Sequence, residues 1–224
     1  MLGFVFPGGS VDVIHAQKND AVAASSLSAA QVTTLPLPFA PPGVAGGGGG
    51  GSAFDKSLVG TISDNTATGI MAKYSFTKQV TASAGYEHIA FTNPSRIVSA
   101  GTTIIGGYVL AYVNNSAFPS TKTLAISWAG VKIAATPHLD VTGAYYRYDQ
   151  NSYAVGANAG CKSSVVSAQC SGTLNAASLV LDYKFTKRFD VYGGAMWSGV
   201  QGGLANGFLN SSTIDPTIGA RYQF

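Results

Sequence analysis

The chain has 224 residues, of which 28 are glycine and 10% are charged, against roughly 25% charged residues in a soluble globular domain. A formal net charge of +3 and the absence of any lysine-rich or arginine-rich run exclude an electrostatic nucleic-acid binder. No stretch reaches the about 18 consecutive apolar residues of a transmembrane helix, so a place in a membrane would require a closed β-sheet.

The first 65 residues form a segment whose strand pattern is weak and confined to Leu2 to Phe6 and Val11 to Ile14. Proline and glycine dominate residues 35–51 (LPLPFAPPGVAGGGGGG), which predicts an extended loop. The glycine run lacks the features of a phosphate-binding loop, because no strand precedes it and no Lys-Ser or Lys-Thr pair follows it. Met1 is followed by no basic region, long apolar region or small-residue cleavage site. We therefore expect no signal peptide, and interpret the chain as a mature piece or a fragment.

A clear strand pattern begins at Thr66 and predicts a hairpin. Apolar side chains alternate with polar or small ones over residues 70–76, and the alternation resumes over residues 80–86 after the short turn Thr77 to Gln79. A period of two residues indicates strands with one apolar and one polar face. In the long connection that follows, Thr103 to Val113 alternates well enough to form a hairpin arm.

A second pair of strands is predicted at Thr121 to Ala135 and Leu139 to Asp149, joined by the turn Thr136 to His138. The alternation is less regular here. Apolar residues favour one face near the turn and the other face further along the first strand, and the apolar face of the second strand would carry Arg147 and Asp149 at its far end. We interpret this either as a β-bulge or as a wall packed against protein instead of lipid.

The third pair is predicted at Thr173 to Phe185 and Arg188 to Trp197, with a turn at Thr186 and Lys187. A loop rich in glycine, serine and asparagine precedes it and carries both cysteines, Cys161 and Cys170. Their proximity predicts a disulfide that clamps the loop in an oxidising compartment. The alternative is two unpaired thiols.

The last twelve residues, TIDPTIGARYQF, form a closing strand with an apolar face that ends on Tyr222 and Phe224. Short turns alternate with long loops along residues 66–224, and aromatic residues stand beside the short turns. Bacterial outer-membrane barrels have short periplasmic turns on one rim, long loops on the other, and aromatic girdles at the interfaces. The pattern therefore predicts an all-β fold, a transmembrane antiparallel up-and-down β-barrel.

The stretches YSFTKQVTASAGYEH, ISWAGVKIAATPHLDVTGAYYRYDQNSY, LVLDYKFTKRFDVYGGAMWS and GLANGFLNSSTIDPTIGARYQF resemble the carboxyl-terminal half of Gram-negative general porins, in particular those of Burkholderia and related proteobacteria. The resemblance covers residues 66–224 and implies part of a sixteen-stranded barrel. It implies a homotrimer in the outer membrane, in contact with lipid and lipopolysaccharide, through which small hydrophilic solutes and ions diffuse passively. It also implies that the final strand, with Tyr222 and Phe224, is the signal read by the outer-membrane assembly machinery.

The chain departs from this family at its front. Seven strands are readable after Thr66, or eight with Leu2 to Phe6, so about half of a sixteen-stranded barrel is missing. Residues 1–65 match no part of the family, and no residue can be assigned to the inward-folded loop that lines the constriction in its members.

Charged side chains on the polar face are the candidate pore-lining residues. A lysine or arginine on the lipid face at midplane would cost about 2 to 4 kcal/mol, so their parity favours a water-filled lumen. For Lys184, Asp190 and Arg221 the alternative is a set of rim charges that form salt bridges between strands. The mixed signs predict weak ion selectivity. The full candidate set is Lys73, Glu87, Lys132, Asp182, Lys184, Asp190, Asp215 and Arg221.

Enzymatic and metal-binding functions find little support. His15, His88 and His138 lack the spacing that would place two ligands on one face, and no G-x-S-x-G motif is present. We expect no cofactor, no metal and no catalytic residue. The main alternative to a porin is a small closed eight-stranded barrel that conducts nothing and serves as an anchor or adhesin.

Overall fold

The structure, a computed structural model, describes residues 1–26, 58–96, 101–105, 108–115, 117–155, 168–206, 208 and 210–224. These residues form eleven strands and one short 3-10 helix, η2 (Gly203–Ala205). The strands are β1 (Leu2–Phe6), β2 (Gly9–Ser26), β3 (Leu58–Ser75), β4 (Val80–Thr92), β5 (Gly101–Ile105), β6 (Tyr108–Asn114), β7 (Lys122–Ala134), β8 (Leu139–Gln150), β9 (Gly172–Lys184), β10 (Phe189–Gly202) and β11 (Ser212–Tyr222).

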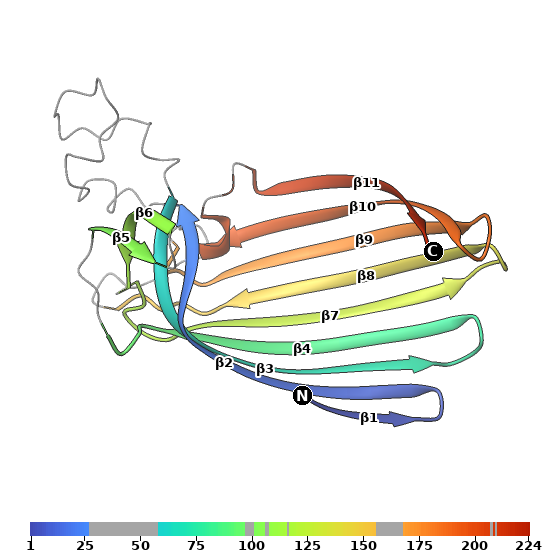
Figure 1. Ribbon diagram of the computed structural model, residues 1–224, viewed down its shortest axis with the longest axis horizontal. Coiled ribbons are helices and arrows are strands. Elements are labelled where there is room, and N and C mark those ends of the chain that lie inside the picture. The colour runs from blue at the N-terminus through green and yellow to red at the C-terminus, as the bar shows by residue number, and fades with distance from the viewer. Residues whose placement is uncertain are drawn as a thin grey trace, which may run out of the picture.

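Nine strands form the main path of a single sheet in the order β1-β2-β3-β4-β7-β8-β9-β10-β11. Every neighbouring pair along this path is antiparallel, which confirms the expected all-β, up-and-down arrangement. The sheet is open, with β1 and β11 at its opposite edges (Figure 1). The β5–β6 hairpin lies off this path and joins the sheet through a short parallel contact between β6 and β3.

The weak pattern at Leu2 to Phe6 is confirmed as β1, and Val11 to Ile14 lie within β2, which is longer than the pattern indicates; the first part of β3 also precedes Thr66. The pairing of β2 with β3 shifts register between Lys18 and Ala21, where Asp20 adopts a left-handed conformation (φ 52°). The Asp64 carboxylate accepts a 2.9 Å hydrogen bond from the Asp20 N–H at this irregularity. A register shift interrupts the two-residue period, which explains why the sequence pattern is weak here.

The bulge interpretation of the second hairpin is wrong. Strands β7 and β8 pair in continuous register from Leu124 opposite Gln150 to Ala134 opposite Asp140. The apolar residues of β7 change face along the strand. Ile133 and Val131, close to the turn, are exposed on one face, whereas Ile126, further from the turn, lies on the opposite and less exposed face. The second interpretation, a wall packed against protein instead of lipid, stays a prediction.

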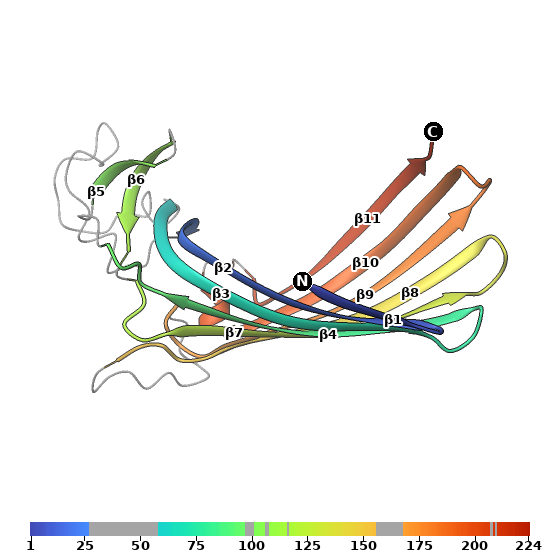
Figure 2. The ribbon, with the colours of Figure 1, turned by 60° about the horizontal axis from the view of Figure 1, so that its bottom comes forward.

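The register sorts the side chains onto two faces, because residues directly opposite each other in a sheet point to the same side. One face, here called the apolar face, carries most of the exposed large hydrophobic side chains, such as Val131 and Leu179, which lie in one cross-strand row. The other, here called the polar face, carries the row of Lys73, Ser83 and Gly130. Side chains of the polar face are the less exposed along β4, β8 and β9, as expected for the inner side of a curved sheet (Figure 2).

Three tight turns at one end of the sheet share a single hydrogen-bond pattern. Thr77, Thr136 and Thr186 each accept, through Oγ1, hydrogen bonds of 3.0–3.2 Å from the backbone N–H groups two and three residues further on. A threonine at the start of a turn stabilises it in this way. The turns that join β3 to β4, β7 to β8 and β9 to β10 lie at the same end of the sheet, which we call the turn end (Figure 1).

Aromatic side chains gather at the turn end of the apolar face. The Tyr74 and Phe76 rings lie 5.0 Å apart, and the Tyr183 and Phe185 rings 4.8 Å apart. At the chain end the Tyr222 and Phe224 rings lie 5.2 Å apart, edge to face. Such pairs add about 0.5 to 1.5 kcal/mol beyond the burial of their area.

At the opposite end, loop residues fold over the polar face. The Phe118 ring lies between those of Phe91, on which it stacks, and Tyr153, to which it is tilted, with centroid distances of 6.2 and 5.8 Å. The Asn93 side chain pairs with the backbone of Phe118 through hydrogen bonds of 2.8 and 3.0 Å. Burial raises the pKa of Tyr153 to about 12. This packing fixes the loops that precede β7 and follow β8.

Candidate functional site

The candidate site is the polar face near the turn end. All eight charged residues predicted from the sequence lie on this face, as the strand register shows. The structure brings five of them into ion pairs and leaves three, Lys73, Glu87 and Asp215, outside every ion pair among the described residues.

A lysine-rich centre forms around Asp140, the second residue of β8. Asp140 Oδ2 accepts hydrogen bonds from Lys132 Nζ of β7 at 2.7 Å and from Lys184 Nζ of β9 at 2.6 Å. The Asp140 side chain is 4% exposed, whereas Lys132 and Lys184 are 54% and 41% exposed. The carboxylate therefore lies beneath two half-exposed ammonium groups and links three strands.

A second charged cluster lies next to the Asp140 centre, where Arg221 of β11 pairs with Asp182 of β9 and Asp190 of β10. Arg221 donates to Asp190 Oδ2 through Nε at 3.0 Å and Nη2 at 2.7 Å, and Nη2 also lies 3.4 Å from Asp182 Oδ2. For Lys184, Asp190 and Arg221 the structure contains the cross-strand salt bridges that we considered as the alternative to pore lining. Lys132, for which the sequence suggested no such salt bridge, also pairs across strands, with Asp140.

Charge is unevenly distributed along this face. Four lysines, Lys73, Lys78, Lys132 and Lys184, border the same hollow as a single carboxylate, Asp140, between β3 and β9. On the β9–β11 side, Asp182 and Asp190 share Arg221, and Asp215 lies on the same face without an ion pair among the described residues. The first group is thus positive and the second negative.

The lysines border a hollow of about 560 Å³ on the polar face. Its wall also includes Trp128 and Tyr146, while Gly130 and Ala144 present little or no side chain to it. The Trp128 indole covers Gly85 of the neighbouring strand, since a Cβ built there would lie 2.6 Å from Nε1. An aromatic ring over a glycine of the adjacent strand stabilises a curved sheet.

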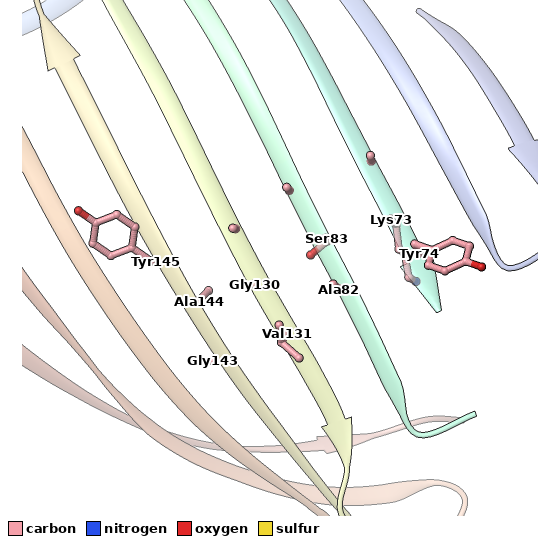
Figure 3. A pocket seen from close by; sticks show the side chains of 12 residues that line it. Lys73, Tyr74, Ala82, Ser83, Gly130, Val131, Gly143, Ala144 and Tyr145 are labelled. Atoms are coloured by element: carbon pink, nitrogen blue, oxygen red, sulfur yellow. The ribbon is translucent and has the colours of Figure 1, made fainter. Parts of the chain in front are cut away.

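A second, shallower groove of about 530 Å³ lies on the apolar side between Tyr74 and Tyr145 (Figure 3). Small residues such as Ala82, Ala129 and Gly143 pass between the two tyrosines. The groove is lined almost wholly by apolar atoms, so it offers close approach to another apolar surface.

Asp140 is the residue that the candidate list lacks. Its signal is present in the sequence, because the alternation of β8 that puts Leu139 and Val141 on the apolar face puts Asp140 on the other face. The apparent irregularity of the second hairpin concealed that signal.

The cysteine prediction falls partly outside the described residues. Cys170 is buried and disulfide-bonded. Cys161 lies outside the described residues, so its pairing with Cys170 stays a prediction.

The histidines are separate from one another. His15 Nδ1 lies 2.9 Å from Thr68 Oγ1, and His138 Nδ1 lies 2.9 Å from the Lys184 carbonyl oxygen. Among the described residues no group of three histidine, cysteine, aspartate or glutamate side chains is placed to hold a metal ion. The part of the chain that the structure describes contains no helix long and apolar enough to cross a membrane.

No protein-family model, characterised protein or solved structure matches this chain. Its function must therefore be inferred from the sheet itself.

Proposed function

We propose that this chain forms one wall of an outer-membrane β-barrel pore of the general porin type, through which small hydrophilic solutes and ions diffuse passively. The observation that carries the proposal is the division of the sheet. At the same depth, one face exposes an apolar band bordered by aromatic rings, and the other carries the charged side chains.

The depth of the apolar band supports a membrane setting. In β9 the band runs from Ala177 to Tyr183 and continues to Phe185 beyond the strand. Eight residue steps at about 3.4 Å span about 27 Å along the strand, or about 20 Å along the membrane normal at a tilt of about 40°. This is close to the about 25 Å band of outer-membrane barrels. Arg147 and Asp149, the charges on the apolar face of β8, lie beyond this band and pair with each other at 2.8 Å.

The direction of the strands bears on how the barrel closes. Nine strands in antiparallel succession leave β1 and β11 running in the same direction. A barrel with only antiparallel pairs must therefore receive an odd number of further strands between these edges. Seven more would give the sixteen strands of a general porin. Residues 15–26 of β2 face no partner on the β1 side, so a preceding strand would also complete that edge.

The polar face would line the water-filled lumen, where its charges act on passing solutes. The positive and negative groups on either side of it would attract ions of opposite sign in different places, which favours weak overall selectivity. The apolar face would contact lipid and lipopolysaccharide. Tyr222 and Phe224 at the last strand would serve recognition by the assembly machinery.

We place the subunit contact of a homotrimer at the groove between Tyr74 and Tyr145. The small side chains there allow two apolar faces to approach closely. Ala129→Trp would fill the groove and should convert trimers to monomers, as measured by native mass or light scattering in detergent. Val180→Trp, on the polar face of β9, is the matched control and should leave the assembly intact. An unchanged trimer in Ala129→Trp would contradict this placement.

The test of the function is planar-bilayer recording with the full-length protein. A stable step conductance, with small uncharged sugars entering vesicles that contain the protein, is the expected result. A correctly folded protein that inserts and gives no conductance would refute the pore and favour the non-conducting anchor or adhesin.

A further inference from the structure

The turn end carries positive charge that no ion pair uses among the described residues. The three threonine turns read Thr-Lys-Gln, Thr-Pro-His and Thr-Lys-Arg, and none of them contains a carboxylate side chain. Lys78, Lys187 and Arg188 are exposed and lie outside every ion pair in the described part of the chain. Asp140 and Asp190, each the second residue of the strand after a turn, are buried and bind cations of neighbouring strands instead. The three turns therefore present cationic side chains to their surroundings.

The three turns form one continuous rim. In each turn the backbone oxygen of the last residue accepts a hydrogen bond of 2.7–2.8 Å from a backbone N–H of the next strand, or from Gln223 just after β11. Successive turns are two strands apart, which corresponds to about 10 Å at about 4.8 Å per strand. Their cations are thus spaced along one edge that the sheet holds in place (Figure 1).

The rim borders the aromatic part of the apolar face. Phe185 and Phe189 stand on either side of the third turn, with ring centroids 5.6 Å apart. The His138 ring of the second turn stacks on the Tyr183 ring, with centroids 6.2 Å apart. Aromatic rings at the ends of membrane-spanning segments lie at the level of the lipid headgroups. In a bilayer the turn cations would therefore reach the phosphate groups of the adjoining leaflet.

We propose that the turn end binds the phosphate groups of anionic phospholipids. Lys187 and Arg188 would make the main contacts through charge-assisted hydrogen bonds, and Lys78, which also borders the hollow on the polar face, would add a further one. Side chains carry this contact, because Thr186 already accepts hydrogen bonds from two backbone N–H groups at the third turn. The inference rests on the proposed function, since lipid reaches the turns only if the apolar face lies in a membrane.

The charge of the lipid decides the preference. In a zwitterionic phospholipid the ammonium group offsets the phosphate charge, so unpaired cations favour a lipid with a net negative charge. At the other end of the apolar face, the charges of Arg147 and Asp149 offset each other at 2.8 Å. We therefore expect the preference for anionic lipid at the turn end and not along the whole apolar face.

The experiment compares two tryptophan reporters on the apolar face. The chain has 2 tryptophans, so Trp128→Phe leaves Trp197, which lies about 27 Å along β10 from Phe189. Adding Trp197→Phe and Phe185→Trp moves the reporter to the third turn. Each protein is reconstituted in phosphatidylcholine vesicles that contain brominated phosphatidylglycerol or brominated phosphatidylcholine, whose bromine quenches a tryptophan in contact with it. The ratio of the two quenching efficiencies gives the preference for the anionic lipid at each reporter.

A preference for phosphatidylglycerol at the turn reporter, absent at Trp197 and weakened by added salt, is the expected result. Lys187→Gln should lower the preference about fivefold, as the loss of one cation beside anionic lipid predicts. Lys187→Arg keeps the charge and should keep the preference. Lys18→Gln, which removes an exposed lysine of β2 nine residues from the turn end of that strand, is the matched control and should leave the preference unchanged.

Three results would overturn the inference. They are equal quenching by the two lipids at the turn reporter, an equal preference at both reporters, and equal effects of Lys187→Gln and Lys18→Gln. Equal quenching combined with sedimentation on insoluble peptidoglycan that Lys187→Gln abolishes would assign the rim to an anionic polymer, and so also contradict the proposal. Conductance across the same bilayers separates the two claims. A conducting protein with equal quenching refutes the lipid contact alone, whereas a lipid preference without conductance refutes the pore alone.

Discussion

The shared carboxylate of Asp140 should be the most important charged group for the stability of the sheet. Asp140→Asn keeps the size of the side chain and removes the charge that holds Lys132 and Lys184 on the neighbouring strands. Each hydrogen bond to a charged group contributes about 1.5 to 3 kcal/mol, but half-exposed lysines regain hydration when released, so we expect a net loss of about 2 kcal/mol.

The matched control is Asp149→Asn. Asp149 pairs with Arg147 at 2.8 Å, nearly as close as the 2.7 and 2.6 Å pairs of Asp140, but both partners are 45% exposed. An exposed pair contributes about 0 to 1 kcal/mol, so this variant should unfold almost as the parent does. Lys132→Met should fall between the two, because Lys184 remains on Asp140.

The assay is equilibrium unfolding in urea of the protein reconstituted in lipid vesicles, followed by tryptophan fluorescence. The free energies of unfolding of Asp140→Asn, Lys132→Met and Asp149→Asn are compared under one set of conditions. A loss in Asp140→Asn no larger than that in Asp149→Asn would show that burial beneath the two lysines gives the carboxylate no special role.

Three further predictions use the same unfolding assay. Thr186→Val removes the hydroxyl that accepts two turn N–H groups and should lower the free energy of unfolding by about 1 kcal/mol. Thr186→Ser keeps a hydroxyl and should lose much less stability. Equal losses in the two variants would exclude the hydroxyl as the cause. Residues 211 and 223, which flank β11, make backbone hydrogen bonds toward β10, and Pro216 has the opposite parity, so its nitrogen points away from β10. Pro216→Ala should therefore leave the free energy of unfolding unchanged, whereas Thr217→Pro should lower it by about 2 kcal/mol or more. A larger loss in Pro216→Ala than in Thr217→Pro would refute this hydrogen-bond pattern. Burial raises the pKa of Tyr153 to about 12, whereas the tyrosine of the unfolded chain loses its proton near pH 10. The free energy of unfolding should therefore fall between about pH 10 and 12, and Tyr153→Phe should reduce that fall. The same pH dependence in the parent and in Tyr153→Phe would contradict this role of Tyr153.

The hairpins after Thr66 could be predicted because their alternation is regular and their turns carry a threonine. The second strand of the middle hairpin was expected from Leu139 to Asp149 and observed at Leu139–Gln150. The front strands were harder to predict for a physical reason. In β2, His15 and Gln17 continue the row begun by Val11 and Val13, so one face changes from apolar to polar along a single strand.

The placement of the charges on one face followed from the alternation, but their contacts did not. Parity alone gives Lys132 and Lys184 the same face. That they meet on one oxygen depends on the register of three strands, which turn lengths set and which a single-strand pattern does not contain. For the same reason, the alternation of single strands does not reveal that Trp128 and Tyr146 stand opposite each other on the face that carries the lysines.

The repeated threonine turn also bears on how such a sheet can change in size. Because each hairpin carries the hydroxyl that fixes its own turn, its register does not depend on the hairpins beside it. Duplication or deletion of a whole hairpin would keep every remaining strand in its direction and every remaining side chain on its face. A barrel assembled from these units can therefore become wider or narrower by two strands at a time, and a shift by one strand would reverse the two rims.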